Sequence, residues 1–231
     1  LFFGIILISI TLAGDKALRV LVLTGAGDAF CGGQDLKEFF RDTYDKPDLR
    51  EKVGKAAMDW GNMLRTFPKA TIASVNGWTF GGGLRVMCSC DLAIASEKAI
   101  FGLSEINFGI FPGGGSTKLP SEILHHLDFL WMAMTVDPIY AATAERWMLV
   151  NKVVPHAEVL STAKQWAQSI CELGPLAVQA TKEAMLRGLE MSLDDGLRLE
   201  LSLSDNVSCT QDARNGVKSF MERQKPTFQG K

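Results

Sequence analysis

Two short glycine runs are the stretches of this sequence whose residue types could do chemistry. The first is GGQD at residues 32–35. The second is GGG at residues 81–83, which leads straight into an apolar run that carries Arg85. Glycine is costly beside a buried helix, but at a helix start free backbone N–H groups point outward and the helix dipole favours negative charge. Two such groups that converge on one oxygen form an oxyanion hole, in which each donor is worth about 2.7–4 kcal/mol in the transition state. Taken singly, either run is also typical of an ordinary tight turn.

Glu105, in the segment GLSEINFG, is the candidate acid or base. Its apolar neighbours Leu103, Ile106 and Phe108 would raise the pKa of its carboxyl group and suit it to proton transfer near neutral pH. A glutamate in a loop is also typical of a solvated surface, so the residue types alone leave both interpretations open.

Short apolar runs bounded by turn residues predict the strands that must position these loops. A helix is expected over residues 51–67, where Pro68 ends it, and another directly after the glycine triplet. This alternation indicates an α/β fold with parallel strands. The strands are expected within residues 17–27, 70–77, 91–96 and 99–102.

From residue 121 the pattern changes to helix, with one possible short strand at residues 152–155. The prediction is therefore an α/β core over residues 1–120 and a helical oligomerisation region over residues 121–231.

The apolar N-terminal segment, residues 1–12, is predicted as a strand because it is rich in β-branched side chains. These are Ile5, Ile6, Ile8, Ile10 and Thr11. The segment is too short to span a bilayer and has no starting methionine, so we expect the core to be incomplete at its N-terminus.

Composition and charge argue against several classes of function. The chain has 231 residues, 47% of them hydrophobic, and a net charge of -2, and its lysines and arginines form no basic stripe that would suit a nucleic acid. Five cysteines without metal-ligand spacing indicate reduced thiols, and His125 and His126 have no further ligand at a suitable spacing, so we expect no metal site. We expect a cytoplasmic protein without membrane association or, in a eukaryote, one of the mitochondrial or peroxisomal matrix.

Three segments occur in the order and spacing typical of one family: VLVLTGAGDAFCGGQDLKEF, ATIASVNGWTFGGG and CDLAIASEKAIFGLSEINFGIFPGGG. In them the chain resembles the crotonase superfamily of enoyl-CoA hydratases and isomerases, and the similarity runs from about Ala17 to Lys231. Within it, DLKEFF, VNGWTFGGG and FGLSEINFGI are most similar to the hydroxycinnamoyl-CoA hydratase-lyases. The resemblance implies a ββα spiral core with a helical C-terminal trimerisation region, and a homotrimer or dimer of trimers. It also implies an acyl-CoA thioester as substrate, with no cofactor beyond the coenzyme A that the substrate carries.

The resemblance further implies roles for particular residues. The backbone N–H groups of Gln34 and Gly82 would hold the thioester oxygen as it becomes enolate-like, and Glu105 would move the proton on the adjacent carbon. Other residues match positions that line the acyl-CoA site or that approach the coenzyme A of a neighbouring subunit: Gly32, Leu36, Ser104 and Phe108 for the first, Lys225 and Phe228 for the second.

Arg85 and Phe39 depart from the family's pattern. Arg85 stands where hydratases carry a second glutamate, which argues against water addition by a two-carboxylate route. If Arg85 faces the cavity, it would favour the charged form of Glu105 or bind a substrate carboxylate; otherwise it points out of the pocket or pairs with a structural carboxylate. Phe39 stands where the hydratase-lyases use a tyrosine to hold the substrate phenol.

The predicted function is that of an enzyme of this family: a lyase, hydratase or isomerase that works through a stabilised thioester enolate, on an aryl-enoyl-CoA such as a hydroxycinnamoyl-CoA. Two alternatives stay open at this point. One is a decarboxylase or other enzyme for a carboxylated acyl-CoA, with Arg85 binding the carboxylate. The other is a catalytically silent protein that keeps the fold for assembly.

Overall fold

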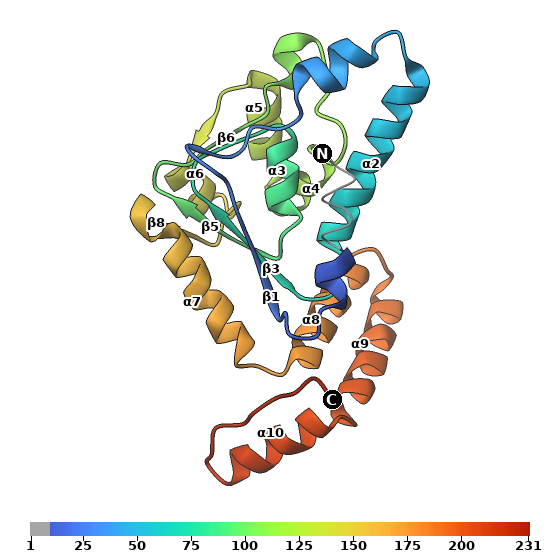
Figure 1. Cartoon of the computed structure of the whole chain (residues 1–231), viewed down its shortest axis with the longest axis vertical. Helices are drawn as coiled ribbons and strands as arrows, with labels where there is room; N and C mark the ends of the chain where they lie inside the picture. The colour runs from blue at the N-terminus through green and yellow to red at the C-terminus, as the bar shows by residue number, and fades with distance from the viewer. Residues whose placement is uncertain (1–9) are drawn as a thin grey trace.

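The computed structural model describes residues 10–231, which form two four-stranded sheets surrounded by helices (Figure 1). The first sheet has the order β1-β3-β5-β8, and all its neighbouring strands are parallel. The second has the order β2-β4-β6-β7, in which β7 is antiparallel to β6. The strands are β1 Val20–Thr24, β2 Ala29–Cys31, β3 Ala70–Val75, β4 Trp78–Phe80, β5 Leu92–Ser96, β6 Ile100–Gly102, β7 Ile139–Tyr140 and β8 Lys152–Val154.

Consecutive strands alternate between the two sheets, from β1 to β2, from β3 to β4 and from β5 to β6, so the chain winds as a spiral of strand–strand–helix units. The first sheet is covered by helices, which is why its strands read as apolar runs; all six residues of β3 are buried. The loops that leave the second sheet carry the candidate chemistry, because β2, β4 and β6 end just before Gly32, Gly81 and Leu103.

Asn76 joins the turns of two successive units. Its Oδ1 accepts the N–H of Gly25 at 3.0 Å, and its Nδ2 donates to the carbonyl oxygen of Gly27 at 2.8 Å. Gly25 is required here because a Cβ at that position would lie 1.9 Å from the carbonyl oxygen of Ala29. The starts of β2 and β4 are thereby fixed relative to each other.

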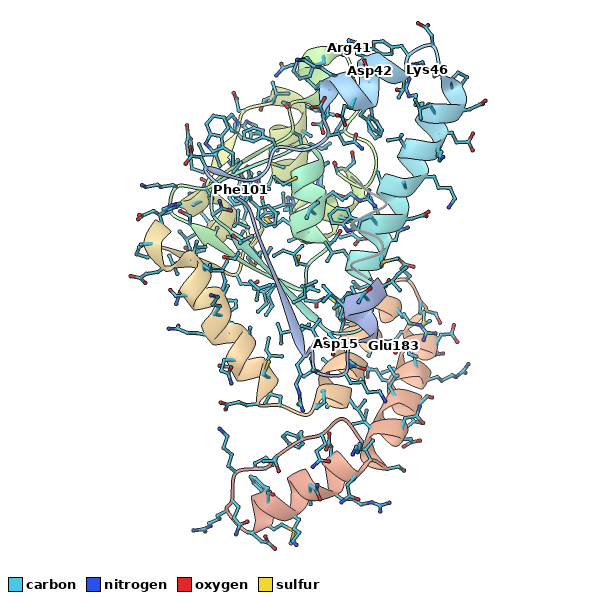
Figure 2. All side chains as sticks on the ribbon, in the orientation of Figure 1. Asp15, Arg41, Asp42, Lys46, Phe101 and Glu183 are labelled. Carbon is cyan, nitrogen blue, oxygen red and sulfur yellow. The ribbon has the colours of Figure 1, made fainter. Side chains whose placement is uncertain are left out.

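The helices surround the sheets and extend the molecule at its C-terminal end. Figure 1 shows α2 along one flank, and α9 and α10 at the end of the molecule away from the start of α2. The same separation is visible in Figure 2, where Arg41, Asp42 and Lys46 lie far from Asp15 and Glu183. The helical elements are η1 Leu36–Phe40, η2 Arg41–Thr43, α2 Pro47–Arg65, α3 Gly82–Cys88, η3 Glu105–Phe108, α4 Lys118–Ile123, α5 His126–Thr135, α6 Ala141–Arg146, η4 His156–Glu158, α7 Val159–Cys171, α8 Pro175–Gly188, α9 Leu193–Ser208 and α10 Gln211–Met221.

The N-terminal segment differs from its prediction. Ile10 and Thr11 lie in a helical stretch, residues 10–14, so the predicted strand is wrong for these two residues. β-branched residues favour a strand only where a neighbouring strand accepts it, and among residues 10–231 β1 pairs only with β3. The rest of the predicted strand, including Ile5, Ile6 and Ile8, lies outside the described residues.

Two strands follow residue 121. β8 confirms the short strand predicted at residues 152–155, whereas β7, two residues long, was not predicted. They complete the two sheets, and the division of the chain at residue 120 stays a prediction. Within residues 10–231, no helix combines the length and the apolar character needed to cross a bilayer.

Substitution of Phe101, in β6, tests how tightly the core between the sheet and its helices is packed. Its side chain is fully buried and lies in the interior in Figure 2. Phe101→Ala should lower the free energy of unfolding by about 3–5 kcal/mol, measured by urea denaturation, because it leaves a cavity. Phe111→Ala, at a site 71% exposed, is the control and should change it by less than about 0.5 kcal/mol. Equal losses in the two variants would contradict this packing.

Candidate active site

The two glycine loops meet at the ends of β2 and β4. A Cβ added at Gly33 would lie 2.9 Å from the carbonyl oxygen of Phe80 and 3.1 Å from the nitrogen of Gly82. A Cβ added at Gly82 would lie 3.7 Å from the nitrogen of Gln34. The 2.9 Å spacing leaves no room for a side chain at Gly33, which also has a φ of +92° that only glycine adopts readily, whereas the spacing at Gly82 is ordinary van der Waals contact. The structure therefore brings the amides of Gln34 and Gly82 to one place.

Both amides are free to donate. Gly82 is the first residue of α3, and Gly81 at its N-cap makes no side-chain capping bond. Among the hydrogen bonds of residues 10–231, neither the N–H of Gln34 nor that of Gly82 is a donor. Gln34 and Gly82 are both partly exposed, so their two unpaired N–H groups are accessible to an acceptor that enters from outside.

Asp35 caps the first loop. Its carboxylate accepts the N–H groups of Lys37 and Glu38 at 2.8 and 2.9 Å, which begins η1. These two backbone bonds, the one to Glu38 first, lower the pKa of Asp35 and keep it ionised. Asp35 is thus engaged in the helix cap, and the N–H of Gln34 just before it is left without a partner.

Glu105 lies directly beside this pair of amides. It is the first residue of η3, and a Cβ added at Gly81 would lie 2.7 Å from its Oε1. The N–H of Gly81 donates to the carbonyl oxygen of Gly102 at 3.0 Å, which holds the loop after β4 against the end of β6. The carboxylate of Glu105 thus packs on the residue that immediately precedes the Gly82 donor.

Burial raises the pKa of Glu105. Loss of hydration is the main cause, and the nearby backbone N–H groups of Glu105 and Ser104 act in the opposite direction. Its Oε2 is buried and has no hydrogen-bond partner within the described chain. A carboxyl group whose pKa is raised toward neutrality can accept and return a proton, as general acid–base catalysis requires.

The side chain of Arg85 is directed toward α2. Its guanidinium is buried and donates from Nη1 to the carbonyl oxygen of Ala57 and from Nη2 to that of Met58, each at 3.1 Å. It pairs with no carboxylate in residues 10–231, and it is not among the causes that shift the pKa of Glu105. The expectation that Arg85 favours the charged form of Glu105 is therefore not met; the pKa moves the other way because desolvation dominates.

The remaining sequence-based site residues fall into two groups. Gly32 lies on the first loop and Leu36 begins η1, while Ser104 and Phe108 cap and end η3, so these four lie on the segments that carry Gln34 and Glu105. Their roles toward a substrate stay predictions.

Lys225 and Phe228 belong to the tail after α10. Lys225 pairs with Glu172 at 2.9 Å, and the carbonyl oxygen of Phe228 accepts from Arg19 at 2.6 Å. Figure 1 shows this C-terminal end well away from α3. Within one chain, therefore, these two residues are separate from the site.

The sequence did not predict what two glycines, Gly81 and Gly61, do for the side chains beside them. Gly81 has a φ of +52° and makes room for the carboxylate of Glu105, and Gly61 of α2 makes room for Arg85. Gly81 is signalled by the triplet itself. Gly61 has no such signal, because it is a lone glycine in a helix and its neighbour Arg85 is distant in sequence. Among residues 10–231, no group of His, Cys, Asp and Glu is arranged to hold a metal ion.

Comparison with known proteins shows which family has a similar sequence. The enoyl-CoA hydratase/isomerase family model matches residues 9–231. The hydroxycinnamoyl-CoA hydratase-lyase of Pseudomonas fluorescens is 38% identical over 217 residues, 92% of this chain and 79% of that protein. The (E)-benzylidenesuccinyl-CoA hydratase of Thauera aromatica is 35% identical over 217 residues, 94% of this chain and 83% of that protein.

The fold agrees with this match. The crystal structure of an enoyl-CoA hydratase from Bacillus anthracis superposes with a TM-score of 0.94 at 32% identity, over 100% of this chain and 88% of that one. The spiral of strand–strand–helix units is thus the crotonase-like fold. The chain belongs to the enoyl-CoA hydratase/isomerase family, and it is an enzyme with acyl-CoA hydratase, lyase or isomerase activity.

The raised pKa of Glu105 predicts a pH-dependent cost in stability. The folded chain holds this proton more tightly than the unfolded chain, so stability falls as pH rises from the unfolded pKa through the raised folded pKa. Glu105→Gln should therefore raise Tm at neutral pH and by progressively less toward pH 4. Scanning calorimetry across this range measures it, with Glu51→Gln on the exposed face of α2 as control. A gain that does not depend on pH would contradict burial as the cause.

Proposed function

We propose that the chain is a hydratase-lyase for aryl-enoyl-CoA thioesters, working through a thioester enolate. The observation that carries the proposal is the pair of unpaired amides, of Gln34 and Gly82, next to the single buried carboxylate of Glu105. The two N–H groups donate to the thioester oxygen, where charge develops, and the carboxyl group exchanges a proton with the carbon beside the carbonyl.

The proposed reaction has two stages. Water adds across the double bond of the aryl-enoyl thioester: its oxygen bonds the carbon beside the ring, and the carbon beside the carbonyl takes a proton through Glu105. The bond between these two carbons then breaks. The hydroxyl proton is lost as the aldehyde forms, and the enolate of acetyl-CoA takes up a proton. The products are an aromatic aldehyde and acetyl-CoA, and the enolate of each stage needs the same two donors.

Exposed aromatic side chains on the elements of the site support an aryl acyl group. Trp78 begins β4, Phe108 ends η3 and Phe111 follows it, and the three are 58%, 57% and 71% exposed. Aromatic rings stack with offset or edge-on geometry, so such residues suit an aryl substrate better than a short alkyl one. The relative from Pseudomonas fluorescens is itself named for a hydroxycinnamoyl thioester.

Phe39 sets a limit on the substrate. Its ring packs edge-on against Phe40 with 4.9 Å between centroids, and it offers no hydroxyl to a substrate phenol. We therefore expect the ring of the substrate to be recognised by apolar contact, and a phenolic hydroxyl to add little to affinity.

Replacing Glu105 tests the proposal. With feruloyl-CoA as substrate, Glu105→Gln should lower kcat by about 100-fold or more, because the proton-transfer group is lost. The dissociation constant of the thioester, from isothermal titration calorimetry, should change by less than about threefold, because amide and carboxyl have the same shape. Vanillin and acetyl-CoA are quantified by liquid chromatography, and Glu51→Gln is the control.

Two further results of the same assay decide the substrate. Cinnamoyl-CoA and 4-hydroxycinnamoyl-CoA should give KM values within about threefold of each other, because residue 39 is not a tyrosine. Turnover of crotonyl-CoA with no aldehyde from any aryl thioester would overturn the lyase assignment, and unchanged kcat in Glu105→Gln would overturn the site.

A homotrimer, or a dimer of trimers, is the assembly that we propose. The support is a set of exposed apolar side chains on α8, α9 and α10 and on the turn between α8 and α9. These side chains are Met185, Leu189, Leu193, Leu197, Leu201, Val217, Phe220 and Met221. On α10, Val217 and Met221 line a groove of about 640 Å³. In such an assembly Lys225 and Phe228 can reach the coenzyme A of a neighbouring subunit.

Sedimentation velocity tests the assembly. The expected species has three or six times the 25.2 kDa mass of the chain. Phe220→Glu, a charge on a side chain 83% exposed in the single chain, should shift the distribution toward monomer because it would be buried in the interface. A monomer at micromolar concentration in the unsubstituted protein would contradict the proposal.

A further inference from the structure

Arg85 occupies a slot formed by three separate segments. Its guanidinium donates to the carbonyl oxygens of Ala57 and Met58 in α2, and its Nε faces Gly115 in the loop after η3. A Cβ added at Gly61 would lie 2.1 Å from Nη2, and one added at Gly115 would lie 2.9 Å from Nε. The slot therefore exists only because both of these positions are glycine.

The first polar side chain of α3 is that of Arg85. Gly81, Gly82 and Gly83 carry no side chains, and the N-cap makes no side-chain hydrogen bond. The first side chains of the helix are Leu84, which is fully buried in the core, and Arg85. The N–H of Gly81 also donates to the carbonyl oxygen of Gly102 at 3.0 Å, so Leu84 and Arg85 are the side chains that add to this backbone link.

We propose that Arg85 is a positioning residue for the oxyanion hole: by clamping the first turn of α3 to α2 and to the loop after Glu105, it sets the direction of the Gly82 N–H. This inference rests on the proposed function of the amide pair, which it deepens.

The charge of Arg85 is not used in an ion pair within the described chain. Its two bonded nitrogens meet carbonyl oxygens of α2, and a carbonyl oxygen has a second lone pair that the helix's own ladder leaves free. Charged donors make shorter and stronger hydrogen bonds than neutral ones, and a planar guanidinium reaches two carbonyls at a fixed angle. A rigid link between α2 and α3 follows from this geometry, whereas an aliphatic side chain would fill the same volume without fixing the direction.

The loop after η3 packs against Arg85 without a hydrogen bond, because Nε is buried and has no partner among the described residues. The N–H of Ile110 donates to the carbonyl oxygen of Glu105 at 3.1 Å, and the loop then runs through residues 113–115 past the guanidinium. Arg85 thus contacts the segments that carry both the donor and the acid–base group, without touching either group itself.

The test compares Arg85→Met with Arg85→Lys and with Arg65→Met. Arg65 is the matched control: it links α2 to α4 through Glu122 at 3.1 Å, and among residues 10–231 its side chain makes no hydrogen bond or ion pair to α3. Arg85→Met should lower kcat by about 10- to 100-fold with KM changed by less than about threefold, as expected for a small misplacement of a donor that acts mainly in the transition state. Arg85→Lys should restore part of kcat, and Arg65→Met should leave kcat unchanged.

Gly61→Ala gives a second, independent variant. An alanine in a helix normally stabilises it, but here the Cβ would displace the guanidinium, so kcat should fall as it does in Arg85→Met. In the double variant Gly61→Ala with Arg85→Met, the loss should be no greater than in Arg85→Met alone, because both substitutions break the same link. Losses that multiply would overturn the proposal.

Amide hydrogen exchange separates this proposal from the proposed function, because it needs no turnover. Peptides that cover residues 82–88 should exchange faster in Arg85→Met than in the unsubstituted protein, and those from α7 should not change. Unchanged exchange and unchanged kcat would show that Arg85 holds nothing in place. A loss of affinity confined to thioesters with a second carboxylate, measured by isothermal titration calorimetry with succinyl-CoA, would instead show that Arg85 binds substrate, which also overturns the proposal.

Absence of turnover on every thioester would remove the proposed function. The exchange measurement would still decide whether Arg85 orders the start of α3. If Arg85→Met does not fold, Gly61→Ala carries both measurements.

Discussion

The convergence of two unpaired amides on one point is the interaction on which the rest of the structure depends. Backbone N–H groups left without partners are costly, and a folded chain normally pairs them. Here the amides of Gln34 and Gly82 come from loops about fifty residues apart in sequence. Each amide lies at the N-terminal end of a helical element, where backbone N–H groups have no partner within the helix. The spiral of paired strands is the device that brings β2 and β4, and hence the two loops, side by side. A substrate oxygen that reaches this point would accept hydrogen bonds from both N–H groups.

The second constraint is that, among residues 10–231, the carboxylate of Glu105 packs beside the amides, whereas that of Asp35 is bound in the cap of η1. Glu105 is desolvated and Arg85, which stands where a second acidic group would be expected in a hydratase, is turned into the protein toward α2. Glu105 is therefore the candidate for proton exchange, whereas Arg85 is bound to backbone carbonyls. In this account Glu105 takes part in the chemistry at the thioester, and Arg85 holds α3, the helix that begins with the Gly82 donor.

The sequence predicted those features that depend on residues close together in the chain. The glycine runs, the strand that ends before Asn76 and the glutamate of GLSEINFG predicted the two loops, their order and the acid–base candidate, and the family resemblance supplied the spiral fold. The direction of Arg85 could not be predicted, since it depends on Gly61 and Gly115, which lie 24 and 30 residues away in sequence. The strand predicted for Ile10 and Thr11 failed for a related reason, because a sheet partner is a property of the whole fold.

The polarisation of a bound thioester carbonyl tests the central claim most directly. In difference Raman spectra of a cinnamoyl thioester labelled with ¹³C at the carbonyl, two converging donors withdraw electron density from the C=O bond and weaken it. The carbonyl band should therefore shift to lower frequency on binding, beyond the shift seen in water, and the shift should persist in the Glu105→Gln protein because the donors are main-chain groups. A bound thioester whose carbonyl band stays at its frequency in water would contradict the existence of the oxyanion hole.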